Sequence, residues 1–397
     1  MARLRRPFLG ALLALLAVLA GSAAQSEFVL VTAEHNGEFP VSSYTLQEDD
    51  FRHPRLALLR SRERLDEVVA PAATQFGKIL LLRSWVRRQW EASGSFYYPP
   101  WDAVEILDLA RKHDNRGFCA QYAIVFLQAC QSLGIHARYV DLPGHFVVAV
   151  WSDDYDRWVL MDPANDLYYE RDGFPMRGRD LHSAYVENAV GGIVQVDSGG
   201  RRKAVTRSDL ANFRLYSIDM AADQISRPVE VKVNGRASQL VRASDYKTYP
   251  RFGRDNMVVT SDFLAWRIQE ADASFPLRPE TRDPDEFRYA LNQTIIFLAN
   301  ERLGKRILKL ALLSSNSTTF QRFLIRADGG TEWVPTPSST VKWLLHPGRN
   351  ELSARVETSF GWKGKVSSLR VFYKPPLFES LPAFRGNVVT LLWHGPA

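Results

Sequence analysis

The chain has 397 residues, of which 46% are hydrophobic and 24% are charged, and this balance excludes a disordered protein and indicates two or three globular domains. Its 50 basic and 44 acidic residues give a formal net charge of +6. No basic run is interleaved with aromatic residues, so we expect no binding to nucleic acid.

Residues 1–24 have the pattern of a secretory signal peptide. Three arginines among the first six residues form a positive head, an apolar run follows from Phe8 to Ala20, and small residues precede the polar Gln25;. An uncleaved membrane anchor is the alternative, but the run is shorter than the ~20 apolar residues of a spanning helix. We therefore predict cleavage near Ala24, a secreted or periplasmic protein, and no integral membrane segment after cleavage.

The N-terminal half carries helical patterns. Residues 61–90 form a helical segment with a break near Pro71, and residues 102–112 form a short amphipathic helix;. A third helix, predicted over 120–133, is apolar around most of its circumference and is therefore a buried core helix. Gly134 is placed to end it.

The only two cysteines of the chain are Cys119 and Cys130. If one helix carries both, the eleven-residue rise separates them by roughly 16 Å. A disulfide requires Cα atoms within about 7 Å, so the two cannot pair. Both are then free thiols, and a free thiol in an exported protein needs a reason.

Strand patterns follow the buried helix, over residues 135–140, 145–151 and 157–162. The last two flank a polar turn at 152–155 and predict a hairpin.

The register of this hairpin places two polar side chains together. If Trp151 pairs with Asp156, then His145 lies directly opposite Asp162, with both side chains on one face and roughly 5 Å apart at Cβ. A slip of one residue would move one of them to the other face.

The C-terminal half is predicted to be β-rich. Residues 204–275 form an intermediate region in which Pro228–Val241 is a hairpin turning at Asn234-Gly235;. About seven strand patterns between Leu291 and Tyr373, separated by turn signals, predict a β-sandwich over residues 286–376.

The chemistry of a cysteine nucleophile fits the start of the buried helix. The attacking species is the thiolate, which a helix N-terminus and a neighbouring imidazole stabilise. The free backbone N–H groups of the first turn can also bind an oxyanion. Cys119 occupies this position, Gly117 lets the backbone approach a substrate, and Asp162 can orient His145.

Each of these residues also has a structural interpretation. A lone cysteine is usually a small core residue, as we expect for Cys130, a histidine beside a glycine often belongs to a turn, and an aspartate before proline is a turn signal. A metal site built from cysteine, histidine and aspartate would need close ligand pairs, which the sequence lacks;. We therefore predict no metal and no cofactor.

Four segments in the same order resemble the core of the transglutaminase-like superfamily over roughly residues 75–170. They are Gly117-Phe118-Cys119-Ala120-Gln121-Tyr122-Ala123, Leu133-Gly134-Ile135-His136-Ala137-Arg138-Tyr139-Val140, Gly144-His145-Phe146 and Trp158-Val159-Leu160-Met161-Asp162-Pro163. The resemblance implies that Cys119 is the nucleophile, His145 the general base and acid, and Asp162 the orienting residue. It also implies a second oxyanion donor from an upstream aromatic residue, for which Trp85 and Trp90 are candidates.

The fold class implied is α+β. A papain-like transglutaminase core, with its catalytic domain over residues 25–195, is followed by the β-rich region and by an immunoglobulin-like β-sandwich. Two features depart from the family pattern: the link from Tyr139 to His145 is very short, and Val147 replaces a more usual polar or aromatic residue.

The leading hypothesis is an exported cysteine hydrolase or acyltransferase that acts on amide bonds of a peptide or protein, with cell-envelope material as a candidate substrate. Protease or amidase activity is favoured over cross-linking, because water needs no acceptor pocket. The alternative is an inert binding or scaffolding protein of the cell envelope that keeps the same fold. A third hypothesis has the C-terminal region bind carbohydrate through Trp333, Trp343 and Trp362.

Overall fold

The computed structural model describes residues 27–34, 47–48, 50–91, 101–112, 117–219, 221–222, 225, 229–233, 236–241, 259–260, 263–266, 280–281, 290–302 and 306–375. The predicted signal peptide, residues 1–24, lies outside the described residues. The chain divides into two compact units, one formed by residues 40–290 and the other by residues 1–39 together with 291–397.

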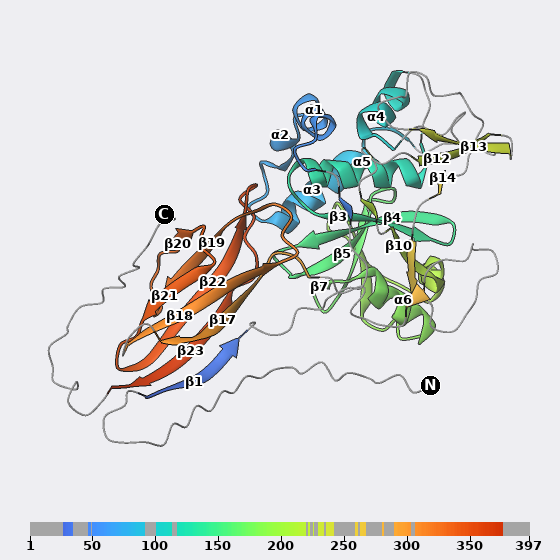
Figure 1. The fold of residues 1–397 in the computed structure, drawn as a ribbon. Coiled ribbons are helices and arrows are strands. Elements are labelled where there is room, and N and C mark those ends of the chain that lie inside the picture. The colour runs from blue at the N-terminus through green and yellow to red at the C-terminus, as the bar shows by residue number, and fades with distance from the viewer. Residues whose placement is uncertain are drawn as a thin grey trace, which may run out of the picture. The chain divides into compact units, whose positions relative to one another are not determined.

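The first unit contains a group of helices packed around one buried helix. They are α1 (Pro54–Arg62), α2 (Leu65–Val69), α3 (Gln75–Arg87), α4 (Ala103–Lys112) and α5 (Cys119–Ser132). Every residue of α5 from Ala120 to Ser132 is buried, and α1, α3 and α4 contact it (Figure 1). The helix begins at Cys119, one residue before the predicted range 120–133, and Gly134 follows its C-terminal end with a φ of 71°.

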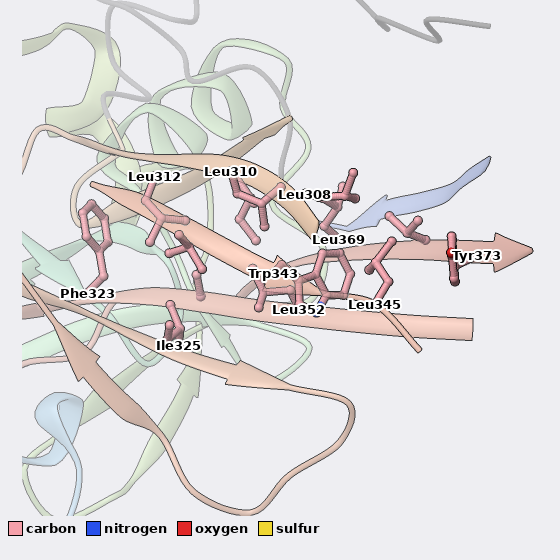
Figure 2. Close-up of a cluster of buried hydrophobic side chains, with 14 of the residues drawn as sticks. Leu308, Leu310, Leu312, Phe323, Ile325, Trp343, Leu345, Leu352, Leu369 and Tyr373 are labelled. Carbon is pink, nitrogen blue, oxygen red and sulfur yellow. The ribbon is translucent and has the colours of Figure 1, made fainter. Parts of the chain in front are cut away.

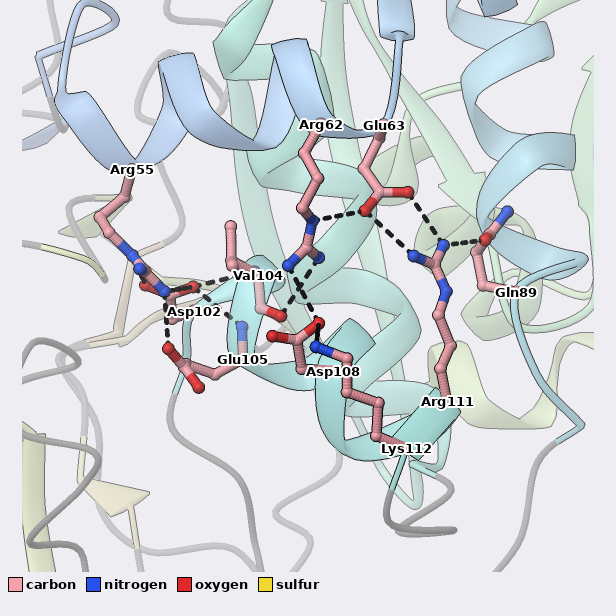
Figure 3. A network of polar contacts seen from close by, with 10 residues as sticks. All are labelled: Arg55, Arg62, Glu63, Gln89, Asp102, Val104, Glu105, Asp108, Arg111 and Lys112. Atoms are coloured by element: carbon pink, nitrogen blue, oxygen red, sulfur yellow. Dashed lines mark hydrogen bonds and ion pairs between the residues drawn. The ribbon is translucent and has the colours of Figure 1, made fainter.

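Ion pairs join α1 to α4 at the surface of this group (Figure 3). Arg55 makes two hydrogen bonds to Asp102, at 2.7 and 2.8 Å, and the Asp102 side chain is only 1% exposed. Asp102 also accepts the backbone N–H of Val104 in the first turn of α4. A carboxylate that both caps a helix and binds a guanidinium holds the two helices in one orientation.

The helices lie against a mixed sheet. Its strand order is β16-β15-β10-β3-β4-β5-β6-β8-β9, with β7 paired to β6, and α5 contacts β3 and β4. Its elements are β3 (Ala137–Leu142), β4 (His145–Ser152), β5 (Arg157–Asp162), β6 (Leu167–Arg171), β7 (Phe174–Pro175), β8 (Ile193–Asp197), β9 (Arg202–Ala204), β10 (Tyr216–Asp219), β15 (Phe263–Trp266) and β16 (Glu280–Thr281). Helix α6 (Gly178–Val186) and the 3-10 helix η1 (Ser208–Arg214) lie between β7 and β10 in the chain.

The β4–β5 hairpin is present, but its register differs from the predicted one. Trp151 pairs with Trp158 rather than with Asp156, and Val148 pairs with Met161. Continuing this ladder would bring Asp162 level with Val147, two residues along from His145. A shift of two residues keeps every side chain on its predicted face, because side chains alternate with a period of two.

The connecting turn explains the shift. Ser152 pairs with Arg157, so the turn has four residues, and its last residue, Asp156, has a φ of 53°. Helix α3 holds this turn: the backbone N–H of Phe76 donates to Asp154 at 2.6 Å. Carboxylates at a helix N-terminus are stabilised by its free N–H groups. The register is therefore set by a tertiary contact.

Strand β10 extends the sheet beyond β3. Ser217 pairs with Asp141 and Ile218 with Val140. The range 204–275, expected as a separate intermediate region, thus contributes strands to the same sheet as His145. Strands β12 (Val229–Val233) and β13 (Arg236–Val241) pair as the predicted hairpin, and its turn, Asn234-Gly235, lies outside the described residues. Two short pairings complete the unit: β14 (Val259–Thr260) with β12, and β11 (Ala221–Ala222) with β2 (Gln47–Glu48).

The second unit consists of two sheets around one core. One has the order β1-β23-β22-β19-β20 and the other β17-β18-β21. Leucines and aromatic residues of both sheets form a single buried cluster, with Trp343 2% exposed (Figure 2). The strands are β1 (Glu27–Glu34), β17 (Gln293–Arg302), β18 (Ile307–Ser315), β19 (Phe320–Ala327), β20 (Val334–Thr336), β21 (Thr340–Leu344), β22 (Gly348–Thr358) and β23 (Ser367–Lys374).

Two findings bear on the sequence predictions for this unit. Strand β1 falls within the range 25–195 allotted to the catalytic domain, yet it pairs along its length with β23. Trp343 belongs to the core, where it has no face open to a carbohydrate. Two facing sheets agree with a sandwich, and an immunoglobulin-like strand order stays a prediction.

Within the described ranges, no helix combines the length and apolar character that crossing a membrane would require.

Candidate active site

Cys119 is the first residue of α5, and the residues around it shape the helix start. Phe118 is the N-cap, and its backbone N–H donates to Oε1 of Gln121 at 2.9 Å. A Cβ on Gly117 would lie 2.4 Å from Cβ of Gln121. Glycine is therefore needed here for the close approach of Gln121, a reason that the sequence did not indicate. The side chain of Gln121, in the first turn of α5, therefore holds the backbone at the start of the helix.

Trp90 fixes the turn before Cys119. Its indole Nε1 donates to the carbonyl of Gly117 at 3.1 Å, and its ring stacks on Tyr122 with 4.2 Å between centroids. The hydroxyl of Tyr122 in turn donates to the carbonyl of Trp90. Because the indole N–H is already engaged, Trp90 acts on the geometry of the helix start rather than as an oxyanion donor. Trp85 lies on α3 and is 8% exposed.

His145 begins β4 directly after a tight turn. Pro143 and Gly144 link β3 to β4, and Gly144 has a φ of 75°, a conformation that favours glycine at the third position of a turn with proline before it. The short link therefore places His145 at the end of the β3–β4 ladder, where it pairs with Leu142. Its side chain is 15% exposed.

Asp162 holds the imidazole. Nε2 of His145 lies 2.7 Å from Oδ2 of Asp162, whose side chain is 5% exposed. Asp162 also accepts the backbone N–H of Asn165 at 3.0 Å and the Asn165 side-chain amide at 2.9 Å. Three donors converge on one carboxylate, which keeps the carboxylate in place and orients the ring. His145 and Asp162 are diagonal neighbours on adjacent strands, and diagonal neighbours are close enough for this hydrogen bond.

The charge state of His145 follows from its two neighbours. Burial favours the neutral ring, but hydrogen bonds from the ring to Asp162 and to Cys119, together with their negative charges, outweigh it and raise the pKa of His145 to about 10. At neutral pH the ring is therefore an imidazolium, with hydrogen bonds to Asp162 and Cys119. The three predicted residues are thus brought together, with the ring placed between sulfur and carboxylate.

A second set of contacts anchors the loop that carries Asp162. Nε of Arg83 and Oγ of Ser84 contact the same carboxylate oxygen of Asp166, at 2.8 and 3.0 Å. Arg83 is 1% exposed, and Asp166 has a φ of 54°. Helix α3 therefore pins the turn between β5 and β6.

The sequence analysis missed Asn165, Arg83 and Asp166. The Asp162-Pro163-Ala164-Asn165 spacing was available as a signal for a side-chain-capped turn. The contact with Arg83, about eighty residues away, had no local signal.

Cys130 differs from Cys119 in its burial. It is fully buried in α5, whereas Cys119 is partly exposed, and both are free. Burial raises the pKa of the Cys130 thiol well above its usual value. The predicted absence of a disulfide between them is confirmed.

Residues 62–163 match the family model of the transglutaminase-like superfamily. The matched segment contains Cys119, His145 and Asp162. No curated protein sequence matches the chain.

Two solved structures were also compared. A red sea bream transglutaminase is 11% identical, with 82% of this chain and 72% of that chain covered and a TM-score of 0.21. A putative protease from Parabacteroides distasonis is 9% identical, with 88% of this chain covered and the same TM-score. The chain spans 63% of the length of that protease. With such low TM-scores, neither structure supports a conclusion about fold or activity.

Proposed function

We propose, from the premise that residues 62–163 form a transglutaminase-like core, that this chain is an exported cysteine enzyme. It cleaves or transfers acyl groups at amide bonds of a peptide or protein. One observation carries the proposal: a charged His145 ring lies between Asp162 and the cysteine that begins α5. A thiolate paired with an imidazolium at a helix N-terminus is the arrangement that activates cysteine nucleophiles.

The first step forms a thioester. The Cys119 thiolate attacks the amide carbon, and the oxygen that becomes negative is bound by free backbone N–H groups of the first turn of α5. The C–N bond then breaks while the His145 imidazolium donates its proton to the departing nitrogen. The amine leaves neutral, and the ring is left as a neutral base.

The second step releases the acyl group. The neutral ring of His145 accepts a proton from water as the water oxygen attacks the thioester carbon. The C–S bond breaks, the product leaves as an acid, and the thiolate–imidazolium pair is restored. An amine in place of water would give transfer. We favour hydrolysis, because water requires no acceptor pocket.

Labelling with a thiol-directed acyl probe tests the proposal. The wild-type protein and Cys130→Ala are expected to be labelled equally, because the Cys130 thiol is buried and protonated. Cys119→Ala is expected to lose labelling, and His145→Ala to lower its rate by roughly 10²–10⁴-fold. Equal labelling of Cys119→Ala and Cys130→Ala would contradict the proposal and favour an inert binding protein.

A further inference from the structure

A pocket lies on the Asp162 side of His145. It has a volume of about 250 Å³, and His145, Asp162 and Asn165 form one wall of it. Cys119 is not among the described residues that line it. A group bound there would therefore contact the imidazole of His145 and the carboxylate of Asp162. Because it would not contact Cys119, it would not be the nucleophile that attacks the thioester formed there.

The opposite wall is polar and has unused hydrogen-bonding groups. Tyr169 lines the pocket and is 7% exposed, and its hydroxyl has no hydrogen-bond partner among the described residues. The side-chain amides of Gln195 and Asn212 also line it without such a partner in the described part of the chain. The Tyr169 hydroxyl is not one of the buried polar atoms that lack a partner, so it is accessible from the pocket and can bind a ligand or water there.

Asp209 gives this wall a negative charge. Hydrogen bonds from the backbone N–H and hydroxyl of Thr206 reach one carboxylate oxygen at 2.7 Å and lower the pKa of Asp209. The other oxygen lies 3.8 Å from the ammonium of Lys203, which is 67% exposed, a distance beyond hydrogen bonding. This oxygen keeps its capacity to accept.

The charges around the pocket favour a cation. The imidazolium of His145 is matched by Asp162, and Asp209 is matched only by the exposed ammonium of Lys203 at 3.8 Å. The described residues that line the pocket include no lysine or arginine, so the lining itself carries an acidic group without a basic one beside it. Burial, with the negative charges of Asp162 and Asp209, raises the pKa of Tyr169. The ring of Tyr169 meets that of Phe213 edge to face at 5.8 Å, and such aromatic faces attract ammonium groups.

The wall is held in place by the fold. A ring nitrogen of the buried His182 on α6 lies 2.6 Å from the carbonyl of Phe213. Phe213, Asn212 and Asp209 all belong to η1, so this contact fixes the element that carries them. The pocket is thus preformed between β6, β8 and η1.

We propose that this pocket binds a primary ammonium group of the substrate, with Asp209 as the counter-charge and Tyr169 and Asn212 as hydrogen-bonding partners. The bound ammonium is a recognition group, and the substrate class is a peptide with a free amino group close to the scissile amide. This inference rests on the proposed function for its meaning, but binding itself does not depend on turnover.

Binding to the full chain carrying Cys119→Ala tests the site without catalysis. The probes are Nα-acetyl-lysine amide, alanine amide and Nα,Nε-diacetyl-lysine amide, titrated by ligand-observed NMR. We expect at least one amine probe to bind roughly tenfold more tightly than the diacetylated one. Preference for the lysine probe would identify a side-chain amine, and preference for alanine amide a peptide N-terminus.

Variants locate the binding. Asp209→Asn keeps an oxygen for Thr206 and is expected to weaken amine binding roughly tenfold, with Tyr169→Phe weakening it about threefold. Asp66→Asn, on the distant α2, is the matched control and is expected to change nothing. Equal binding of the acetylated and amine probes, or full binding by Asp209→Asn, would overturn the inference. Failure of the acyl probe to label Cys119 in the wild-type protein, with amine binding retained, would instead refute the proposed reaction and leave this inference standing.

Discussion

At the scale of single residues, His145 connects the site. Its ring meets Asp162 on one side and Cys119 on the other, and both raise its pKa to about 10. In the proposed reaction the ring must be charged to protonate the leaving amine. On the basic side of the pH profile, the acylation rate should therefore fall as the pH rises through the pKa of the ring. We call this fall the basic limb of acylation.

Replacing Asp162 by asparagine tests this link. The change removes the negative charge that helps to raise the pKa of His145, so the basic limb of acylation should move from about pH 10 toward lower pH. The rate at neutral pH should also fall, by roughly 10²–10⁴-fold, because the ring loses its orienting carboxylate. Single-turnover acylation across pH measures both effects. An unmoved basic limb would show that Asp162 does not set the charge of the ring.

At the scale of elements, the site is assembled from α5, the β4–β5 hairpin and the turn after β5. Helix α3 joins them, because it contacts the hairpin turn through Phe76 and Asp154 and the next turn through Arg83 and Asp166. The position of the Asp162 carboxylate thus depends on a helix that contributes no residue to the Cys119–His145–Asp162 group.

Arg83→Met is expected to loosen this connection. It leaves Asp166 without its cation, and breaking a buried ion pair costs about 3–5 kcal/mol of folding free energy. The Asp166 end of the pair is 15% exposed, which places the loss at the lower part of that range. The basic limb of acylation should shift in the same direction as for Asp162→Asn, because the turn that carries Asn165, the partner of Asp162, is held less firmly.

Urea unfolding and the acylation pH profile measure the two effects of this change. Arg83→Lys, which restores a charge without the planar guanidinium, should recover part of both. A loss of stability with an unshifted pH profile would mean that Arg83 supports the fold alone.

At the scale of the whole molecule, two units have separate cores. The second unit is closed by β1 and β23, which lie at opposite ends of its sequence, and its buried cluster is made of its own residues. Each unit buries its own apolar surface, so each should respond by itself to a change in its core.

Trp343→Ala tests that independence. Removing a Trp side chain from a close-packed core costs about 3–5 kcal/mol, so the second unit should unfold at lower urea concentration. Labelling of Cys119 in the native protein should keep its wild-type rate. Circular dichroism in urea and labelling kinetics provide the two measurements. A slowed labelling reaction would show that the units are coupled.

The sequence by itself determined the features that depend on local periodicity. The buried helix to within one residue of its start, the hairpin from His145 to Asp162 and the face that these two residues share all follow from spacing, because helices repeat every 3.6 residues and strands every two. The order of the four motif segments was enough to predict the resemblance to the transglutaminase-like superfamily, whose family model matches residues 62–163.

Only the tertiary structure decided the rest. The two-residue shift of the hairpin arose from an αL residue at Asp156 and from the hold of α3 on the turn. The anchoring of Asp166 by Arg83, the pairing of β1 with β23 and the polar wall opposite His145 join segments that are far apart in sequence. Such contacts are set by the packing of whole elements, and no local pattern encodes them.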